Sequence, residues 1–274
     1  MIYTVLLAVL FGILEGITEW LPISSTGHLI LLRHFLPVTY REKFFSLFEV
    51  VIQLFALCAV LWRFFPMLWP FSHKKSADER RGIYRLWGRV LIAALPAAVV
   101  GLLFGEAIET QLSSPAVIAA ALIGYGVLFL CLFRHPSKHG KQGKDLAGIT
   151  VKHALAVGLF QVLALLPGTS RSGATILGGL FVGLNRETAA LFSFFLGIPT
   201  MLGASALRVL GFWKSGTLLT AAEWLTLAIG CAVSFAVSLL VVDFLMSFVR
   251  RHSFAAFGIY RILLGAAVLV TLIF

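Results

Sequence analysis

Charged side chains are scarce in this sequence. Of 274 residues only 12% are Asp, Glu, Lys or Arg and 59% are hydrophobic, against roughly 25% and 45–50% in soluble domains. The mean hydropathy is +0.97, and the apolar residues form long runs. A soluble chain of this length could not bury so much apolar surface. The composition therefore excludes a soluble protein and predicts a membrane protein.

Cysteine and acidic residues are also few. The three cysteines stand singly inside apolar runs, which excludes a disulfide framework and a paired-cysteine zinc site. The net charge of +10 comes from basic residues in short stretches between apolar runs. That pattern sets membrane orientation and contacts lipid headgroups, so nucleic acid is not an expected partner. The N-terminus has no Lys or Arg before its apolar stretch, so a cleavable signal peptide is not expected.

Six apolar runs are long enough, at about 1.5 Å per residue, to cross or nearly cross a hydrocarbon core of about 30 Å. They cover residues 44–63, 89–105, 115–133, 188–209, 221–248 and 254–274. The second and third are short or interrupted by glycine, so their ends are the least well defined.

Two further apolar regions are too short and too broken to span. Residues 2–14 lead into Glu15, Glu19 and the polar run Ser24-Ser25-Thr26-Gly27-His28. Residues 153–183 repeat this form, with a polar turn at 167–173 between two short arms. Short arms around a polar turn are typical of re-entrant helix hairpins, which are tolerated at membrane depth where they are buried or line a wet cavity.

The two hairpin regions align with each other at an offset of 146 residues, which places Glu15 on Gln161 and Ser24 on Ser170. Each half then has one hairpin and three spans, and an odd number of spans inverts the second half. We expect an all-α polytopic membrane protein with six transmembrane helices and two re-entrant hairpins, forming one domain over 1–274. Its inverted-topology repeats would cover 1–135 and 150–274, with a cytoplasmic linker over 134–152. Sites in such proteins lie near the midplane, where the broken helices meet.

Basic residues mark one side of the membrane. They concentrate in loops 63–89 and 134–152 and after the fifth span, whereas loop 106–114 has two acidic residues and no Lys or Arg. The positive-inside rule puts the three basic segments in the cytoplasm. Both termini and the first hairpin then face outside, and the second hairpin enters from the cytoplasm.

Ionisable groups at membrane depth cost roughly 2.5–3.5 kcal/mol each, so those of the hairpins are candidates for a site. Glu15 and Glu19 share one face of a helix, where two like charges demand a proton or a cation. Mg²⁺ or Ca²⁺ suits carboxylate oxygens and would bridge to phosphate. The alternative is a structural pair with one carboxyl protonated and hydrogen-bonded to the backbone.

The first turn adds hydroxyl groups and an imidazole. Ser24, Ser25 and Thr26 lie within reach of His28, and a hydroxyl beside a histidine base is the minimum for nucleophilic phosphoryl transfer. The alternative is that these hydroxyls only satisfy loose backbone groups of a re-entrant turn.

Arg171 lies in the second turn without an acidic neighbour in the sequence. Its guanidinium fits phosphate. An anion-binding turn around it would be completed by Thr169, Ser170, Ser172 and Gly173. The alternative is an ion pair with Glu15 or Glu19, and both can hold at different stages.

Three further polar residues are interpreted as supporting groups. Glu49 and Gln53 form a second pair four residues apart, inside the first full span, and Gln161 is the counterpart of Glu15. We expect them to orient the carboxylates or line the cavity. A plain interhelical hydrogen bond is the alternative for Glu49 and Gln53.

At these residues the sequence resembles the undecaprenyl pyrophosphate phosphatase family of bacteria, the bacitracin-resistance type. The matching stretches are Glu15-Gly-Ile-Thr-Glu-Trp-Leu-Pro-Ile-Ser-Ser-Thr-Gly-His28 and Leu166-Pro-Gly-Thr-Ser-Arg-Ser-Gly-Ala-Thr175, with weaker matches at 48–53 and 259–261. Length and hydropathy agree over the whole chain.

The resemblance implies a multi-pass protein of the bacterial inner (plasma) membrane. Its implied reaction is hydrolysis of undecaprenyl pyrophosphate to undecaprenyl phosphate and phosphate at a site facing the periplasm or cell exterior. This recycles the lipid carrier for cell-wall glycan synthesis, with Mg²⁺ or Ca²⁺ as cofactor. It assigns the paired acids to Glu15 and Glu19, the nucleophile and base to Ser25 and His28, and the phosphate clamp to Arg171 with Ser170. We favour attack by Ser25, while attack by His28 or by water stays open.

The runner-up is a polyprenyl-phosphate flippase or another secondary transporter, since these are built on the same inverted repeats. A carrier would need Arg171 and the hydroxyls but not a histidine base. An ion channel would leave Arg171 without a purpose. The expected partners are the polyprenyl pyrophosphate lipid and the bilayer, and a homodimer stays open.

Overall fold

The computed structural model describes residues 2–133 and 143–272, and these residues form helices and their connections. The first part contains α1 (Ile2–Thr18), α2 (Ser25–Phe35), α3 (Glu42–Arg63), α4 (Phe65–Leu68), α5 (Ala77–Leu112) and α6 (Pro115–Phe133). The second contains α7 (Val151–Val162), the 3-10 turn η1 (Leu163–Leu165), α8 (Arg171–Phe181), α9 (Arg186–Lys214), α10 (Ala221–Arg251) and α11 (Ala255–Val270). The prediction of an all-α fold is confirmed. The predicted linker over 134–152 lies partly outside the described residues, with the basic residues at 134, 138 and 141.

Five helices of the described chain are long and apolar enough to cross a membrane, namely α3, α5, α6, α9 and α10. The sixth predicted span, 254–274, corresponds to α11, which has 16 residues. It falls among the shorter apolar helices together with α1 and α7–η1. At about 1.5 Å per residue, α11 is roughly 24 Å long. The protein is therefore a multi-pass membrane protein, with five helices long enough to span the membrane and several shorter apolar helices.

The helix that contains the second predicted span is longer than the span itself. We expected a span over 89–105, and α5, which includes these residues, has 36 residues. It begins early because Ser76 and Glu79 form a capping box, in which the Glu79 N–H donates to Ser76 Oγ at 3.2 Å and the Ser76 N–H donates to Glu79 Oε2 at 2.7 Å. Pro96 lies inside the helix without ending it. Much of the expected basic loop, and most of the acidic loop at 106–114, is therefore helical.

The two hairpins have closely similar turns. Ser24 precedes α2 with φ 72° and ψ 109°, and Ser170 precedes α8 with φ 71° and ψ 121°. They are the two non-glycine residues with positive φ in the described part of the chain. Such a backbone costs a residue with a side chain about 1–3 kcal/mol. The same unfavourable conformation therefore recurs at the two positions that the offset of 146 aligns.

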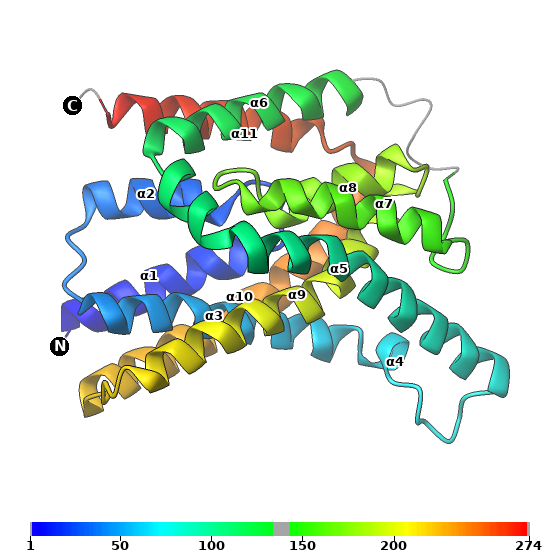
Figure 1. Ribbon diagram of the computed structural model, residues 1–274, viewed down its shortest axis with the longest axis horizontal. Coiled ribbons are helices and arrows are strands. Elements are labelled where there is room, and N and C mark those ends of the chain that lie inside the picture. Colours follow the sequence, from blue (N-terminus) through cyan, green and yellow to red (C-terminus); the bar gives the residue numbers. More distant parts are fainter. Residues whose placement is uncertain (1, 134–142, 273–274) are drawn as a thin grey trace.

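The first arm of each hairpin packs on a long helix from the other half of the chain, α1 on α10 and α7 on α5. Helices α6 and α11 pack along each other at the edge of the molecule (Figure 1). In the same view α1 begins at the left, the end of the molecule where the N-terminus is marked, whereas α7 begins toward the right. The two hairpins thus enter the molecule from opposite ends.

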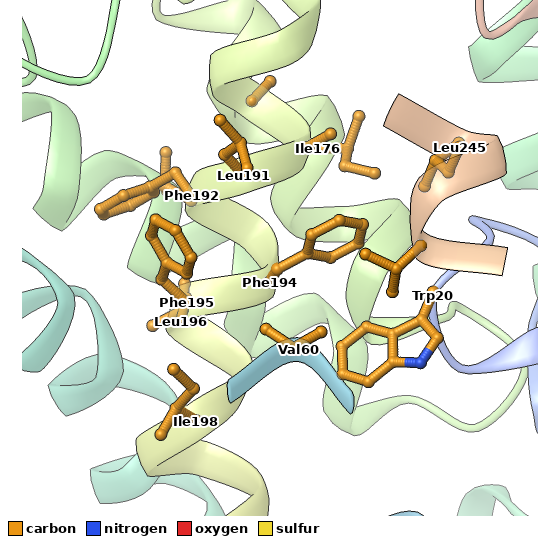
Figure 2. Close-up of a cluster of buried hydrophobic side chains, with 14 of the residues drawn as sticks. Trp20, Val60, Ile176, Leu191, Phe192, Phe194, Phe195, Leu196, Ile198 and Leu245 are labelled. Carbon is orange, nitrogen blue, oxygen red and sulfur yellow. The ribbon is translucent and has the colours of Figure 1, made fainter. Parts of the chain in front are cut away.

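The core gathers around α9, the most buried of the five long helices. Figure 2 shows Phe194 of α9 directed toward Trp20, and the two rings meet edge to face with centroids 5.4 Å apart. Ile176 of α8 belongs to the same cluster. Since Trp20 directly follows Glu19, this cluster holds the first turn in the interior, beside the second hairpin.

Candidate active site

The two hairpins meet at an ion pair. Arg171, the first residue of α8, donates from Nη2 to Glu19 Oε1 at 2.8 Å. The two side chains are only 15% and 7% exposed. The structure therefore brings together a predicted acid and the predicted clamp from the two ends of the sequence. It adopts the alternative in which Arg171 pairs with an acid of the first hairpin.

Arg171 lies along one face of α9. Its Nη1 donates to the carbonyl oxygen of Ser193 at 2.8 Å, and its Nη2 contacts Met201 Sδ at 3.5 Å. Between these two residues, a Cβ on Gly197 would stand 2.6 Å from Nη1, so only glycine leaves room for the guanidinium. The Nε–H has no hydrogen-bond partner in the described chain. The guanidinium thus contacts Glu19, Ser193 and Met201 in this state, and its Nε–H remains available as a donor.

Gln53 reaches the same carboxylate from α3. Its Nε2 donates to Glu19 Oε2 at 3.3 Å, so both oxygens of Glu19 accept a hydrogen bond. Glu49, one turn earlier on α3, instead pairs with Arg33 of α2 at 3.4 Å. The structure therefore places Gln53 on Glu19 and turns Glu49 toward α2.

Glu15 lies one turn before Glu19 and is 7% exposed. Its carboxylate has no hydrogen bond or ion pair among the described residues, although it is in the electrostatic field of Glu19, Glu49 and Arg171. The described chain contains no cluster of three or more His, Cys, Asp or Glu that could hold a metal. Mg²⁺ is commonly held by one or two carboxylates together with phosphate oxygens and water. The pair of acids fits a cation that arrives with a phosphate group, since one buried carboxylate has no protein partner.

Both ring nitrogens of His28 form hydrogen bonds, and neither bond is to Ser25. Its Nδ1 donates to the carbonyl oxygen of Ser24 at 2.7 Å, and its Nε2 accepts from the Tyr260 hydroxyl at 2.6 Å. The two rings stack with centroids 5.5 Å apart. Because a carbonyl oxygen only accepts, the proton is on Nδ1 and Nε2 is the basic nitrogen. A hydrogen bond from Ser25 to His28 is not present in this state.

The hydroxyls of the first turn are free of structural hydrogen bonds. Ser24 makes no side-chain cap on α2, and Ser25 and Thr26 make no side-chain hydrogen bond within the described chain. The first N–H groups of α2 are therefore uncapped beside three hydroxyls. A helix N-terminus of this kind binds anions, so this turn can receive a phosphate group.

The second turn uses its hydroxyls differently. Ser170 Oγ accepts from the Gly173 N–H at 3.2 Å, and Ser172 Oγ donates to the carbonyl oxygen of Leu21 at 3.1 Å. Thr169 is fully buried and its hydroxyl lies beside Tyr125. Ser170 therefore caps α8 and Ser172 joins the two turns, while Arg171 remains the phosphate-binding candidate here.

Gln161 of α7 does not join the acids. It is buried, and neither atom of its amide has a partner in the described chain. The offset of 146 aligns Gln161 with Glu15 in the sequence. In the structure, however, Gln161 forms no hydrogen bond with Glu19 or Arg171.

Two residues of α11 contact the turns and were given no role from the sequence. Tyr260 bonds His28, and Arg261 is fully buried and donates to the backbone of both turns. The signal was present, because an arginine inside the apolar run 254–274 is as unusual as Arg171.

An apolar groove of about 530 Å³ lies between α5 and α7. It is lined by Leu95, Pro96, Val99, Val100, Leu159, Val162 and Leu163. The related pair of α1 and α10 is closely packed at Gly12 and Gly16, where an added Cβ would meet α10 at 2.8 Å. The residue of α7 that aligns with Gly16 at the offset of 146 is Val162. At this position α1 packs closely on α10, whereas in the α7–α5 pair Val162 lines the groove.

Comparison with known proteins agrees with the earlier resemblance. A family profile described as bacitracin resistance protein BacA matches residues 8–267. An undecaprenyl-diphosphatase of Enterococcus faecalis is 48% identical over 268 residues, covering 97% of this chain and 96% of that protein. Undecaprenyl-diphosphatase 1 of Clostridioides difficile (strain 630) is 48% identical over 262 residues, covering 96% and 94%. An undecaprenyl-diphosphatase of Streptococcus mutans is 47% identical over 268 residues, covering 97% and 95%.

Proposed function

Because the chain belongs to the bacitracin resistance protein family, we propose that it is an undecaprenyl-diphosphatase. It hydrolyses undecaprenyl diphosphate to undecaprenyl phosphate and inorganic phosphate, and so returns the lipid carrier for cell-wall synthesis. The observation that carries the proposal is the buried pair of Glu19 and Arg171, drawn from two separate hairpins. Burying a charge pair at membrane depth costs free energy. Its presence there therefore indicates a functional site.

The pair neutralises itself until substrate arrives. A diphosphate carries enough negative charge to replace Glu19 as the partner of Arg171, and the Nε–H and Nη2–H groups can then donate to phosphate oxygens. The uncapped start of α2 lies in the other hairpin and offers further N–H donors. The terminal phosphate would therefore bind between the two turns.

Ser25 is the proposed nucleophile. Its oxygen forms a bond to the terminal phosphorus as the bond from phosphorus to the bridging oxygen breaks, and undecaprenyl phosphate leaves. The hydroxyl proton passes to His28 Nε2, which must exchange its bond from Tyr260 for one from Ser25. His28 passes this proton to the phosphate oxygen of the departing undecaprenyl phosphate and becomes neutral again. Water then attacks the phosphoserine with Nε2 of His28 as base, and the proton that Nε2 takes from water is returned to the Ser25 oxygen as phosphate leaves. Direct attack by water on the terminal phosphorus needs the same base but no phosphoserine.

Glu15 and Glu19 are the proposed ligands of Mg²⁺ or Ca²⁺. When bound, such a cation supplies positive charge that neutralises the phosphate oxygens and favours departure of the leaving group. Glu19 is available for this once Arg171 has turned to phosphate. Gln53 then keeps its carboxylate oriented through the bond to Oε2.

The proposed membrane arrangement has α11 as a sixth, short span and both hairpins as re-entrant segments of inverted repeats. The matching φ and ψ angles of Ser24 and Ser170 support the repeat, as does the entry of the hairpins from opposite ends (Figure 1). The basic residues around α4 and at the start of α5 lie at the end away from both termini and favour the cytoplasm. The first hairpin, and the site with it, would then open to the outer face of the bacterial inner membrane.

The groove between α5 and α7 is the proposed resting place of the prenyl chain. Its lining is apolar and ends at Leu163, in the short turn that leads to Arg171. An isoprenoid chain needs an apolar path next to the phosphate site, and the seven residues that line this groove are all apolar.

Release of phosphate from undecaprenyl diphosphate by the purified protein in detergent tests the function. Wild-type protein should turn over many times, a chelator should stop it, and added Mg²⁺ or Ca²⁺ should restore it. Glu19→Ala should lose activity even at saturating cation. Turnover that survives both chelation and Glu19→Ala would remove the proposed role of the acids, and no turnover by the wild type would remove the function itself.

A further inference from the structure

One arginine of α11 joins the two turns. Arg261 donates from Nη1 to the carbonyl oxygen of Pro22 at 3.2 Å and from Nη2 to the carbonyl oxygen of Gly168 at 2.9 Å. Pro22 and Gly168 are themselves related by the offset of 146 residues that aligns the hairpins. The guanidinium therefore binds the same backbone position in both turns.

Arg261 has no acidic partner. Its side chain is 0% exposed, and no carboxylate of the described chain lies within ion-pair distance. Its guanidinium carbon lies 5.5 Å from the centre of the Tyr125 ring, and its Nε has no hydrogen-bond partner among the described residues. A charge buried in this way is unfavourable at membrane depth. An apolar side chain would fill this space without burying a charge. An arginine is explained by its planar guanidinium, which can donate to two carbonyl oxygens at once.

The two carbonyls lie close in sequence to the ion pair. Pro22 is three residues after Glu19, and Gly168 is three residues before Arg171. A Cβ on Gly173 would stand 3.1 Å from Arg261 Nη1, so the guanidinium also lies against the first turn of α8. A change in the separation of the carbonyls would therefore move Glu19 and Arg171 relative to each other.

We propose that Arg261 is a positioning residue that fixes the separation of the two turns and does not touch the substrate. Its effect on catalysis rests on the proposed function, whereas its effect on the turns does not. Both effects can be measured on the same purified protein.

The first experiment is amide hydrogen exchange of Arg261→Met, which keeps a long side chain without charge or donors. Exchange over residues 19–27 and 166–174 should become at least about tenfold faster together, while α3 and α10 keep their protection. The matched control is Arg208→Met, an arginine of α9 that pairs with Glu109 at 3.2 Å and is half exposed. It should leave both turns unchanged. Faster exchange in only one turn, in neither, or uniformly along the chain would overturn the proposal.

The second experiment separates positioning from substrate contact by kinetics. Arg261→Met should lower kcat roughly a hundredfold, the scale expected for a misplacement of about 1 Å, with KM for undecaprenyl diphosphate changed less than about twofold. Arg261→Lys should lose about as much, because an ammonium lacks the planar fork. Added methylguanidinium should restore Arg261→Ala, and methylammonium should not. A raised KM at unchanged kcat, or full activity with lysine, would contradict positioning by the fork.

These outcomes remain distinct from a failure of the proposed function. If the wild type releases no phosphate, the function is wrong, and the exchange experiment still decides whether Arg261 holds the turns. If Arg261→Met does not fold, Arg261→Lys carries the same exchange measurement, since it keeps the charge.

Discussion

Breaking the ion pair from either side should have unequal effects. Removing one partner of a buried pair costs about 3–5 kcal/mol, because the other charge is left buried and uncompensated. In Glu19→Ala that charge is the guanidinium of Arg171, which stays protonated and keeps only neutral partners in Ser193 and Met201. In Arg171→Ala the remaining carboxyl can bind a proton and still accept from Gln53. Glu19→Ala should therefore be less stable than Arg171→Ala, by about 1–2 kcal/mol.

The pair itself is measured by a double-mutant cycle. The double variant Glu19→Ala, Arg171→Ala should be more stable than the sum of the single effects predicts, with a coupling energy of about 1–3 kcal/mol. Thermal unfolding in detergent, followed by loss of the monodisperse peak in size-exclusion chromatography, gives the order of stability. Inorganic diphosphate should raise the unfolding temperature of Glu19→Ala more than that of the wild type, because the anion replaces the missing carboxylate. Additive effects within about 0.5 kcal/mol, or equal anion stabilisation of both proteins, would refute the reasoning.

Three other variants test separate parts of the site. Gly197→Ala should lower kcat at least about tenfold, since its Cβ would stand 2.6 Å from the guanidinium of the ion pair. The control is Gly203→Ala on the same helix, where an added Cβ meets nothing within 4 Å, and it should match the wild type. Equal activity of the two would show that the guanidinium position is not critical. Val99→Trp should fill the α5–α7 groove and raise KM for undecaprenyl diphosphate but not for farnesyl diphosphate; the same change for both substrates would place the long chain elsewhere. Tyr260→Phe removes one hydrogen bond to the histidine base, worth about 1 kcal/mol. Because that bond must be given up for the one from Ser25, kcat should rise by about fivefold, whereas a fall in kcat would contradict this competition for Nε2.

Charged residues inside apolar segments are the most informative feature of the sequence, because burying a charge at membrane depth costs free energy. This cost singled out Glu19 and Arg171, and the structure places them 2.8 Å apart although 152 positions separate them. The same criterion applied to the last apolar run would have marked Arg261. Its two acceptors are backbone carbonyls, however, and no pattern of side chains predicts which carbonyls a turn exposes.

Two other features could not be predicted from local sequence. Hydropathy detects the lipid-facing part of a helix and not its polar ends, so it does not reveal the capped and charged start of α5. The orientation of the His28 ring depends on Tyr260, 232 positions away, and the neighbouring Ser25 gave no information about it. The backbone strain at Ser24 and Ser170 likewise follows from how the hairpins are buried.

The central claim is that an arginine from one hairpin acts on a phosphate held by the other. Its most direct test is the rate of phosphate release from undecaprenyl diphosphate by Arg171→Ala, compared with Arg208→Ala as a control from the exposed part of α9. Loss of a guanidinium that stabilises phosphoryl transfer typically lowers kcat by about 10³-fold or more, so Arg171→Ala should fall by that factor and Arg208→Ala should stay within about twofold. A rate for Arg171→Ala within about tenfold of the wild type would contradict the shared site.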